Sequence, residues 1–375
     1  MDSAPDRRPG ASDPDPPGSW RPRLRADLAD IPAYQAGRRP AASSGPVFSL
    51  ASNEAPAGPS PAVLEAIAAA GASVNRYPDP ASTALVAALA DRVGFPADAI
   101  VVGTGSVALC QQLVTAAAGP GDEVIFAWRS FEAYPIVVRT AGATAIAVPL
   151  DDDGRHDLAA MAAAVNERTR LVFLCSPNNP TGPALRAEEV RQFLAAVPDD
   201  LVVVLDEAYA EYVTDPQAAD GLALATDHRN LVVLRTLSKA YGLAGLRVGY
   251  GVADPAVVAP LRAVSLPFGV SRVAEAAGVA VLAEPEEVDR RVAGTVLERR
   301  RVADALARSG WRVPDPQGNF VWLPLGAAAQ EFSDACTGAG VTVRCFPQDG
   351  VRVTVAEPAA NDIFLAVASR WQGRR

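Results

Sequence analysis

The feature that most constrains the fold is a series of seven short apolar runs, rich in β-branched residues, within residues 100–252. Stretches rich in Ala, Leu and Glu precede or separate them, such as Thr83–Val93 and Ala187–Ala196, and these favour helix. Strands that are apolar throughout are buried on both faces, which is typical of a mostly parallel sheet covered by helices. The seven runs are Ile100–Gly103, Glu123–Ala127, Thr144–Leu150, Leu171–Cys175, Leu201–Leu205, Leu231–Arg235 and Val248–Val252. We therefore predict a large α/β domain that binds ligands at the carboxyl ends of its strands.

A chain of 375 residues exceeds what one compact core accommodates, so a second domain is expected. After Ser271 the pattern changes to long helical runs, three short strands and a closing helix. These are Glu275–Ala283, Pro285–Ser309, Phe320–Leu323, Val341–Arg344, Val351–Val355 and Ala360–Trp371. We predict a smaller α/β domain there, completed by the segment before Asn53. The predicted division is a disordered tail at 1–25, an N-terminal segment at 26–59, a large domain at 60–268 and a small domain at 269–375.

Composition excludes several classes of protein. A net charge of −9 and a pI near 4.9 argue against nucleic acid as a partner, since phosphate binding needs a basic face. No unbroken apolar run is long enough to span a bilayer, and the Pro- and Asp-rich start lacks the apolar core of a secretory signal. We therefore expect a cytoplasmic protein. Its four widely spaced cysteines are expected to be buried, reduced thiols: Cys110, Cys175, Cys336 and Cys345.

The chain contains a single lysine, Lys239, among 34 basic residues, and all the others are arginine. Arginine supplies positive charge as lysine does, but it cannot lose its proton near neutral pH and attack a carbonyl. A chain that retains one lysine is therefore expected to need its amine. Thr236 and Ser238 flank this lysine, and Arg247 follows it. Two hydroxyls and a guanidinium around an amine suit a phosphorylated aldehyde, with which the amine forms a Schiff base.

A carboxylate and a phenol follow another predicted strand and are expected at the same edge of the sheet. Asp206 comes directly after the run Leu201–Leu205, and Tyr209 lies three residues further on. A carboxylate in this place can keep the nitrogen of a pyridine ring protonated, which makes the ring an electron sink. If such a ring also carries a phenolic oxygen, Tyr209 can form a hydrogen bond with that oxygen.

Three loop motifs add groups at this edge. Asn179, in S-P-N-N-P-T-G, places an amide beyond a predicted strand. Gly105 and Ser106, in G-T-G-S, form a turn before a predicted helix, where free backbone N–H groups can bind a phosphate. Phe131, in S-F-E-A-Y, can cover one face of a ring. Each motif is common alone, and the case for a site rests on their convergence.

The motifs G-T-G-S, S-F-E-A-Y, S-P-N-N-P-T-G, D-E-A-Y and T-L-S-K-A-Y-G-L-A-G-L-R-V-G occur in the order found in class-II, fold-type-I aminotransferases. The chain resembles this family from about Ala26 to Trp371, and most of all its histidinol-phosphate and aromatic amino acid members. The resemblance implies pyridoxal 5′-phosphate bound to Lys239, with Asp206 at the pyridine nitrogen. It implies further cofactor contacts from Gly105, Ser106, Phe131, Asn179, Tyr209, Thr236, Ser238 and Arg247. The family usually has tyrosine where Phe131 stands, so a hydroxyl contact is lost.

The resemblance also implies where a substrate and a second subunit bind. Arg352, in G-V-R-V-T-V, matches the arginine that binds the substrate carboxylate, and Arg344 is a second candidate. Tyr34 matches an N-terminal segment that folds over the substrate. Tyr77, in N-R-Y-P, matches a tyrosine that reaches the phosphate of the neighbouring subunit, which implies a homodimer with a shared site. The alternatives are an internal ion pair for Arg352 and a surface turn for Tyr77.

The substrate is predicted from finer similarities. The runs G-T-G-S-V-A-L-C-Q-Q-L and W-R-S-F-E-A-Y look closer to the aromatic branch, and Q-A-G-R-R-P at Gln35–Pro40 departs from the family's usual opening. We predict transamination of phenylalanine or tyrosine with a 2-oxo acid such as 2-oxoglutarate, in which Lys239 moves the proton. The alternative is a histidinol-phosphate aminotransferase of histidine biosynthesis. A decarboxylase or a β-lyase would use the same cofactor residues, and a ligand-sensing regulator would need a DNA-binding domain, which the short leader cannot supply. No metal site is expected, and His156 and His228 are expected on the surface or in loops.

Overall fold

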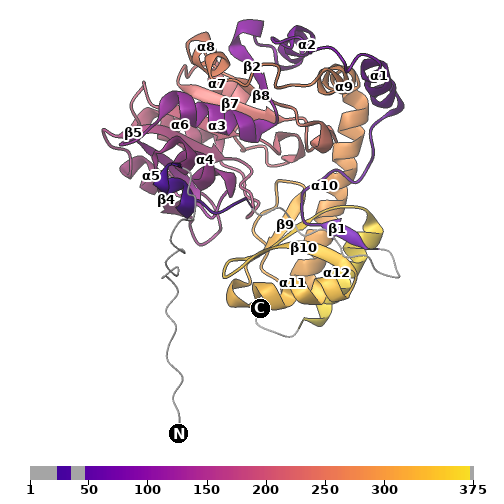
Figure 1. Ribbon diagram of the computed structural model, residues 1–375. Helices are drawn as coiled ribbons and strands as arrows, with labels where there is room; N and C mark the ends of the chain where they lie inside the picture. Colours follow the sequence, from indigo (N-terminus) through magenta and orange to yellow (C-terminus); the bar gives the residue numbers. More distant parts are fainter. Residues whose placement is uncertain (1–22, 35–46, 372–375) are drawn as a thin grey trace, which may run out of the picture.

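The computed structural model describes residues 23–34 and 47–371 (Figure 1). Most of the expected N-terminal tail and the altered segment Gln35–Pro40 lie outside the described residues. Figure 1 shows a larger body that contains the strands β2 to β8 and a smaller body that contains β1 and β9 to β11, with the long helix α10 between them. Among the described residues, no helix is both long and apolar enough to cross a membrane.

The larger body is built on a seven-stranded sheet in the order β2-β8-β7-β6-β5-β3-β4. Its neighbouring strands are parallel except β8, which runs antiparallel to both β2 and β7. This confirms the predicted mostly parallel sheet, and all seven predicted strands are present. They are β2 (Ile100–Gly103), β3 (Glu123–Trp128), β4 (Thr144–Pro149), β5 (Thr169–Cys175), β6 (Val202–Asp206), β7 (Leu231–Thr236) and β8 (Gly249–Val252).

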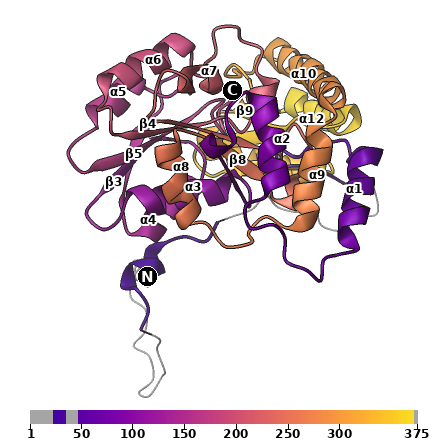
Figure 2. The same ribbon diagram turned by 90° about the horizontal axis from the view of Figure 1, so that it is seen from above.

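Helices cover both faces of this sheet, as continuous apolar strands require. Alternate residues of one strand enter different clusters: Val203 and Leu205 pack on one side of β6, and Val204 on the other. The first face is covered by α1 (Pro61–Gly71), α2 (Thr83–Val93), α5 (Leu158–Ala163), α6 (Ala187–Ala196), α7 (Gly221–Ala225) and α9 (Arg272–Leu282). The second face is covered by α3 (Ser106–Ala117), α4 (Ala133–Ala141) and α8 (Pro255–Ala263), and Figure 2 shows the two layers.

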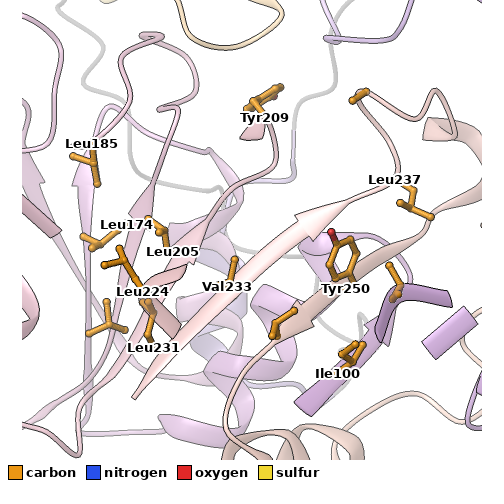
Figure 3. Close-up of a cluster of buried hydrophobic side chains, with 14 of the residues drawn as sticks. Ile100, Leu174, Leu185, Leu205, Tyr209, Leu224, Leu231, Val233, Leu237 and Tyr250 are labelled. Atoms are coloured by element: carbon orange, nitrogen blue, oxygen red, sulfur yellow. The ribbon is translucent and has the colours of Figure 1, made fainter. Parts of the chain in front are cut away.

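The first cluster holds the central strands in place beneath the site. Leu174, Leu205 and Val233 come from the adjacent strands β5, β6 and β7 and belong to this one cluster (Figure 3). All three side chains are fully buried. Burial of such a side chain contributes about 1.5–3 kcal/mol to the stability of the fold, so this packing holds the carboxyl ends of the three strands in place.

The smaller body contains a four-stranded sheet in the order β1-β10-β11-β9. Its strands are β1 (Phe48–Leu50), β9 (Phe320–Leu323), β10 (Val341–Phe346) and β11 (Gly350–Thr354), and β1 is parallel to β10. The helices α10 (Pro285–Arg308), α11 (Ala329–Gly338) and α12 (Pro358–Arg370) pack against it around a third cluster. The pairing of β1 brings the chain from the small sheet directly to Asn53. The domain boundaries given above stay a prediction.

Candidate active site

A cavity of about 570 Å³ lies between the carboxyl edge of the large sheet and the strands β10 and β11 of the small sheet. Two of the expected residues, Gly105 and Tyr77, are not among the residues that line it. The other expected residues all line it, and they are Tyr34, Ser106, Phe131, Asn179, Asp206, Tyr209, Thr236, Ser238, Lys239, Arg247, Arg344 and Arg352. The convergence predicted from strand ends is therefore present as one cavity.

Lys239 lies three residues beyond the end of β7, with its amine at the cavity wall. Its Nζ donates hydrogen bonds to the backbone oxygens of Ser52, at 3.1 Å, and Asn53, at 3.2 Å. Burial lowers the pKa of this amine to about 7, and the positive charges of Arg352 and Arg247 act in the same direction, while Glu54 opposes them. A substantial fraction of the amine is therefore neutral near pH 7, which is what attack on a carbonyl requires.

Asp206 ends β6 and is 3% exposed. Its Oδ2 accepts a hydrogen bond of 2.7 Å from the Tyr134 hydroxyl, whereas its Oδ1 is buried and has no partner among the described residues. Burial raises the pKa of the carboxyl to about 6, and the bond from Tyr134 opposes this rise. A buried carboxylate oxygen without a donor is costly, so this atom fits a cationic N–H that enters the cavity, such as that of a protonated pyridine ring.

The other end of the cavity fits a phosphate. Ser106 begins α3, so its backbone N–H belongs to the positive end of the helix dipole. Gly105 precedes it with a φ of 84°, and a Cβ here would lie 2.5 Å from Nη2 of Arg247. Glycine is therefore required for the guanidinium to approach the turn. Arg247 donates to Oγ of Ser238 at 3.4 Å. Thr236 also lines the cavity, and its hydroxyl donates to the backbone oxygen of Val248 at 3.2 Å and accepts from the backbone N–H of Ser238 at 3.1 Å. The backbone N–H of Ser106, the Ser238 hydroxyl and the guanidinium together suit a dianion.

Two neutral groups lie between these ends, as expected for contacts with a phenolic oxygen. The Tyr209 hydroxyl accepts a hydrogen bond of 2.9 Å from Nδ2 of Asn53, and burial raises its pKa to about 12, so it stays protonated. Oδ1 of Asn179 accepts a bond of 2.5 Å from Arg352, which leaves the amide N–H groups of Asn179 for the cavity. Phe131 makes an edge-on contact with Tyr134, with ring centroids 5.5 Å apart.

The wall opposite the large sheet carries two arginines on paired strands. Arg344 on β10 and Arg352 on β11 are register partners. Nη2 of Arg352 donates to the backbone oxygen of Ala51 at 2.7 Å, while its buried Nε has no partner among the described residues. That open donor fits one oxygen of a carboxylate. Arg344 forms an ion pair with Glu132, whose carboxylate lies 2.6 Å away. The alternative of an internal ion pair therefore describes Arg344 rather than Arg352.

Tyr34 and Tyr77 differ in their relation to the cavity. Tyr34 lines it and is 54% exposed, so its ring lies at the rim. Tyr77 is 78% exposed and stacks on Phe268, with ring centroids 4.7 Å apart. Its expected contact with the site of a neighbouring subunit stays a prediction.

One expectation from the sequence holds only in part and another is wrong. His156 lies in the loop between β4 and α5, which was one of its two expected places, but it is only 6% exposed, because it bridges to Leu150 and its Nε2 lies 3.1 Å from Oδ1 of Asn178. Burial lowers the pKa of this imidazole to about 4, so it is neutral. Cys345 is only partly buried, whereas the other three cysteines are buried, and all four are free thiols. His228 is partly exposed, in the turn before β7.

Sequence reasoning also missed three residues that touch the expected site. Asn53 binds Tyr209, Tyr134 binds Asp206, and Glu132 binds Arg344. Tyr134 and Glu132 stand within S-F-E-A-Y, so this motif carried the signal for them as well as for Phe131. Asn53 carries no motif signal, and its role depends on a contact between residues 156 positions apart. Within the described part of the chain, no group of His, Cys, Asp and Glu is arranged to hold a metal ion.

Comparison with known proteins agrees with this arrangement. The sequence profile of the family described as "Aminotransferase class I and II" matches residues 45–367. The chain is 53% identical to the aromatic amino acid aminotransferase of Streptomyces coelicolor over 352 residues, which cover 94% of this chain and 98% of that one. It is 54% identical to the protein of the same name from Rhodococcus jostii over 354 residues, which cover 94% and 97%.

A solved structure supports the same assignment. The fold is similar to the crystal structure of histidinol-phosphate aminotransferase from Sinorhizobium meliloti in complex with pyridoxal-5′-phosphate. The TM-score is 0.83 at 29% sequence identity, and the match covers 94% of this chain and 98% of the other. The chain therefore belongs to the class I and II aminotransferase family, which confirms the resemblance seen in the sequence.

Proposed function

We propose that this protein is a pyridoxal-phosphate-dependent aminotransferase that moves an amino group between an aromatic amino acid and a 2-oxo acid such as 2-oxoglutarate. The observation that carries the chemistry is the pairing of two groups in one cavity. These are the amine of Lys239, whose pKa is lowered to about 7, and the buried Oδ1 of Asp206, which no described residue contacts by a hydrogen bond. An amine and a carboxylate so placed fit the aldehyde and the ring nitrogen of this cofactor.

Each residue of the site has a role in this reaction. Pyridoxal phosphate, when bound, supplies an aldehyde that accepts an amino group and a ring that takes up electrons as the Cα proton leaves. Asp206 would hold the proton on the ring nitrogen, and Tyr209 with Asn179 would bind the phenolic oxygen. Ser106 and Arg247, with the neighbouring hydroxyls, would hold the phosphate. The amine of Lys239 would act as the base that accepts the proton from Cα of the substrate and as the acid that gives it back.

The substrate is bound from the small sheet. Asn179 and Ala51 hold the Nη atoms of Arg352, and its Nε has no partner among the described residues, so this side chain would be free to bind an amino acid carboxylate. Both substrates of a transamination carry this carboxylate, so one arginine serves both halves of the reaction. Arg344, the Phe346 ring below it and Tyr34 lie where the side chain of the substrate would extend.

The sequence comparisons favour an aromatic substrate over histidinol phosphate. Relatives named aromatic amino acid aminotransferase are 53% and 54% identical, whereas the similar histidinol-phosphate aminotransferase structure is 29% identical. The decisive experiment compares phenylpyruvate with imidazole acetol phosphate, using glutamate as the donor. We expect phenylpyruvate to be used far better. Preference for imidazole acetol phosphate would identify a histidinol-phosphate enzyme, and release of carbon dioxide or ammonia would identify a decarboxylase or a lyase.

We also propose a cytoplasmic homodimer in which Tyr77 completes the cofactor site of the partner subunit. Tyr77 and Phe268 form an exposed aromatic pair outside the cavity of their own chain, next to Leu266, which is 72% exposed. Sedimentation should therefore give about twice the chain mass of 38.9 kDa. Tyr77→Phe should weaken cofactor retention, an effect that can reach a cavity only across a subunit interface. A fully active monomer would contradict this proposal.

A further inference from the structure

The short segment Ala51–Asn53, which follows β1, contacts three functional groups of the site. The backbone oxygen of Ala51 accepts a bond from Arg352, and those of Ser52 and Asn53 accept bonds from Lys239. The side chain of Asn53 binds Tyr209. One segment thus links the substrate arginine, the reactive amine and a cofactor contact. Of its three side chains, only that of Asn53 makes such a link, since the others act through backbone oxygens.

The geometry of Asn53 fixes which way its amide points. Asn53 is fully buried and has a left-handed φ of 53°, a conformation that Asn, Asp and Gly adopt most readily. Its backbone N–H donates to Oγ1 of Thr354 at 2.9 Å, and that hydroxyl donates to Oδ1 of Asn53 at 2.9 Å. Since the amide oxygen is occupied by a donor, the amide nitrogen is the atom that faces Tyr209, at 2.9 Å from its hydroxyl oxygen.

The direction of this bond decides what Tyr209 can do. An amide N–H is a donor only, so the hydroxyl oxygen of Tyr209 is the acceptor in this contact. The hydroxyl proton is then left for another acceptor, and Tyr209 lines the cavity. Were an acceptor to stand in place of the amide nitrogen, the hydroxyl would donate to it and turn its lone pairs toward the cavity. Asn53 therefore leaves the Tyr209 hydroxyl as a hydrogen-bond donor toward the cavity.

We propose that Asn53 is a positioning residue: it fixes Tyr209 as a hydrogen-bond donor to the phenolic oxygen of the cofactor and thereby lowers the pH at which the cofactor-linked nitrogen of Lys239 loses its proton. This inference rests on the proposed function. A donor at the phenolic oxygen stabilises its negative charge and reduces its attraction for the proton on the neighbouring nitrogen. Loss of that donor must raise the pH midpoint of the protonation.

The test is the pH-dependent absorbance of the loaded enzyme, which reports this protonation directly. Asn53→Gly keeps the left-handed backbone accessible and removes the amide. Its midpoint should rise by about half to one pH unit, the scale of one hydrogen bond. Asn53→Asp is isosteric and keeps the bond from Thr354, but it offers Tyr209 an acceptor, so its midpoint should rise at least as far. Its negative charge alone also raises the midpoint, so if the glycine variant does not fold, Asn53→Asp is compared with and without Tyr209→Phe. A smaller rise when Tyr209 is already replaced supports the proposal, and equal rises overturn it.

Two further variants separate positioning from loss of structure. Tyr209→Phe should raise the midpoint too, and the double variant with Asn53→Gly should show no further rise, because Asn53 acts through Tyr209. Asn361→Ala is the matched control: Asn361 is 1% exposed, lies in α12 and does not line the cavity, so the midpoint should stay that of the wild type. A wild-type midpoint in both Asn53 variants, or shifts of Asn53→Gly and Tyr209→Phe that add, would overturn the proposal. A wild type that binds no cofactor would instead overturn the proposed function.

Discussion

The two walls of the cavity are built differently. On the cofactor wall, Asp206, Tyr209 and Lys239 follow the neighbouring strands β6 and β7, so their positions are set by strand ends within one sheet. On the substrate wall, Arg352 is held by Asn179 and Ala51, which are 173 and 301 positions away in sequence. The first wall is therefore a local product of the sheet, whereas the second exists only when the small sheet packs against the large one.

The walls also differ in charge. The cofactor wall presents a carboxylate oxygen of Asp206 that has no partner among the described residues, together with the Lys239 amine, the Tyr209 hydroxyl and, at the phosphate end, the Arg247 guanidinium. The substrate wall presents two guanidinium groups, one with an open Nε at Arg352 and one paired with Glu132 at Arg344. An aromatic ring with a cationic nitrogen matches the first wall, and a carboxylate matches the second. Cofactor chemistry and substrate binding should therefore respond to different substitutions.

The largest effect is expected on the substrate wall. Arg352→Ala leaves the substrate carboxylate without its buried partner, which costs roughly 2–5 kcal/mol, or about thirty- to several-thousand-fold in kcat/KM. Glutamate and phenylalanine should lose activity alike, since both present the same carboxylate, while cofactor absorbance remains. Arg352→Lys should recover only part of the lost kcat/KM, because an ammonium cannot form the two parallel hydrogen bonds that a guanidinium forms with a carboxylate. Steady-state kinetics within about a factor of three of the wild type would make Arg352 structural.

The next effect belongs to the cofactor wall. Asp206→Asn keeps the shape of the side chain but removes the charge that would hold a proton on the ring nitrogen. We expect kcat to fall by about 10²–10³-fold, as for other fixed charges that stabilise a transition state, with KM little changed. A fall in kcat with little change in KM distinguishes Asp206→Asn from Arg352→Ala, since Arg352→Ala should act mainly on substrate binding. Equal changes of KM in both variants would contradict the separate roles of the two walls.

A smaller effect is expected at the rim, where Glu132 balances the charge of Arg344. Glu132→Gln removes the negative charge and leaves the shape, so the distal carboxylate of glutamate should be bound better relative to an aromatic ring. The ratio of kcat/KM for glutamate to that for phenylalanine should rise by about two- to fivefold, the scale of a partly exposed ion pair. Glu188→Gln, in the exposed i,i+3 pair with Arg191, is the matched control and should leave the ratio unchanged.

The smallest effect is expected on the pKa of Lys239, which Arg352 on the opposite wall influences. Burial lowers the pKa of Lys239 to about 7, and Arg352 adds to the shift. The neutral amine is the reactive form, so cofactor uptake by the apoprotein should rise with pH and reach half its maximal rate near pH 7. Arg352→Ala removes one positive charge and should move this midpoint upward by a fraction of a unit. A midpoint near the ordinary lysine value of about 10.4, followed by absorbance, would show that the amine is not desolvated.

The sequence predicted the cofactor wall well because apolar runs reveal strands and functional residues follow their ends. Asp206 and Asn179 emerged in this way, whereas Lys239 emerged as the single lysine of the chain. The reversed direction of β8 was not predicted, since an apolar run looks the same in either direction. The buried state of His156, the bond from Asn53 to Tyr209 and the pair of Glu132 with Arg344 depend on contacts between distant segments. A single sequence carries no direct signal of such contacts.

The central claim is that Lys239 carries the cofactor, and borohydride reduction of the loaded protein tests it most directly. Reduction should fix pyridoxal phosphate on one amine, and the chain offers only Lys239 and its N-terminus. We predict a single labelled peptide that contains Lys239, and no label in Lys239→Arg, because a guanidinium does not form the bond. Label on the N-terminal amine instead, or none on a protein that still transaminates, would contradict the account.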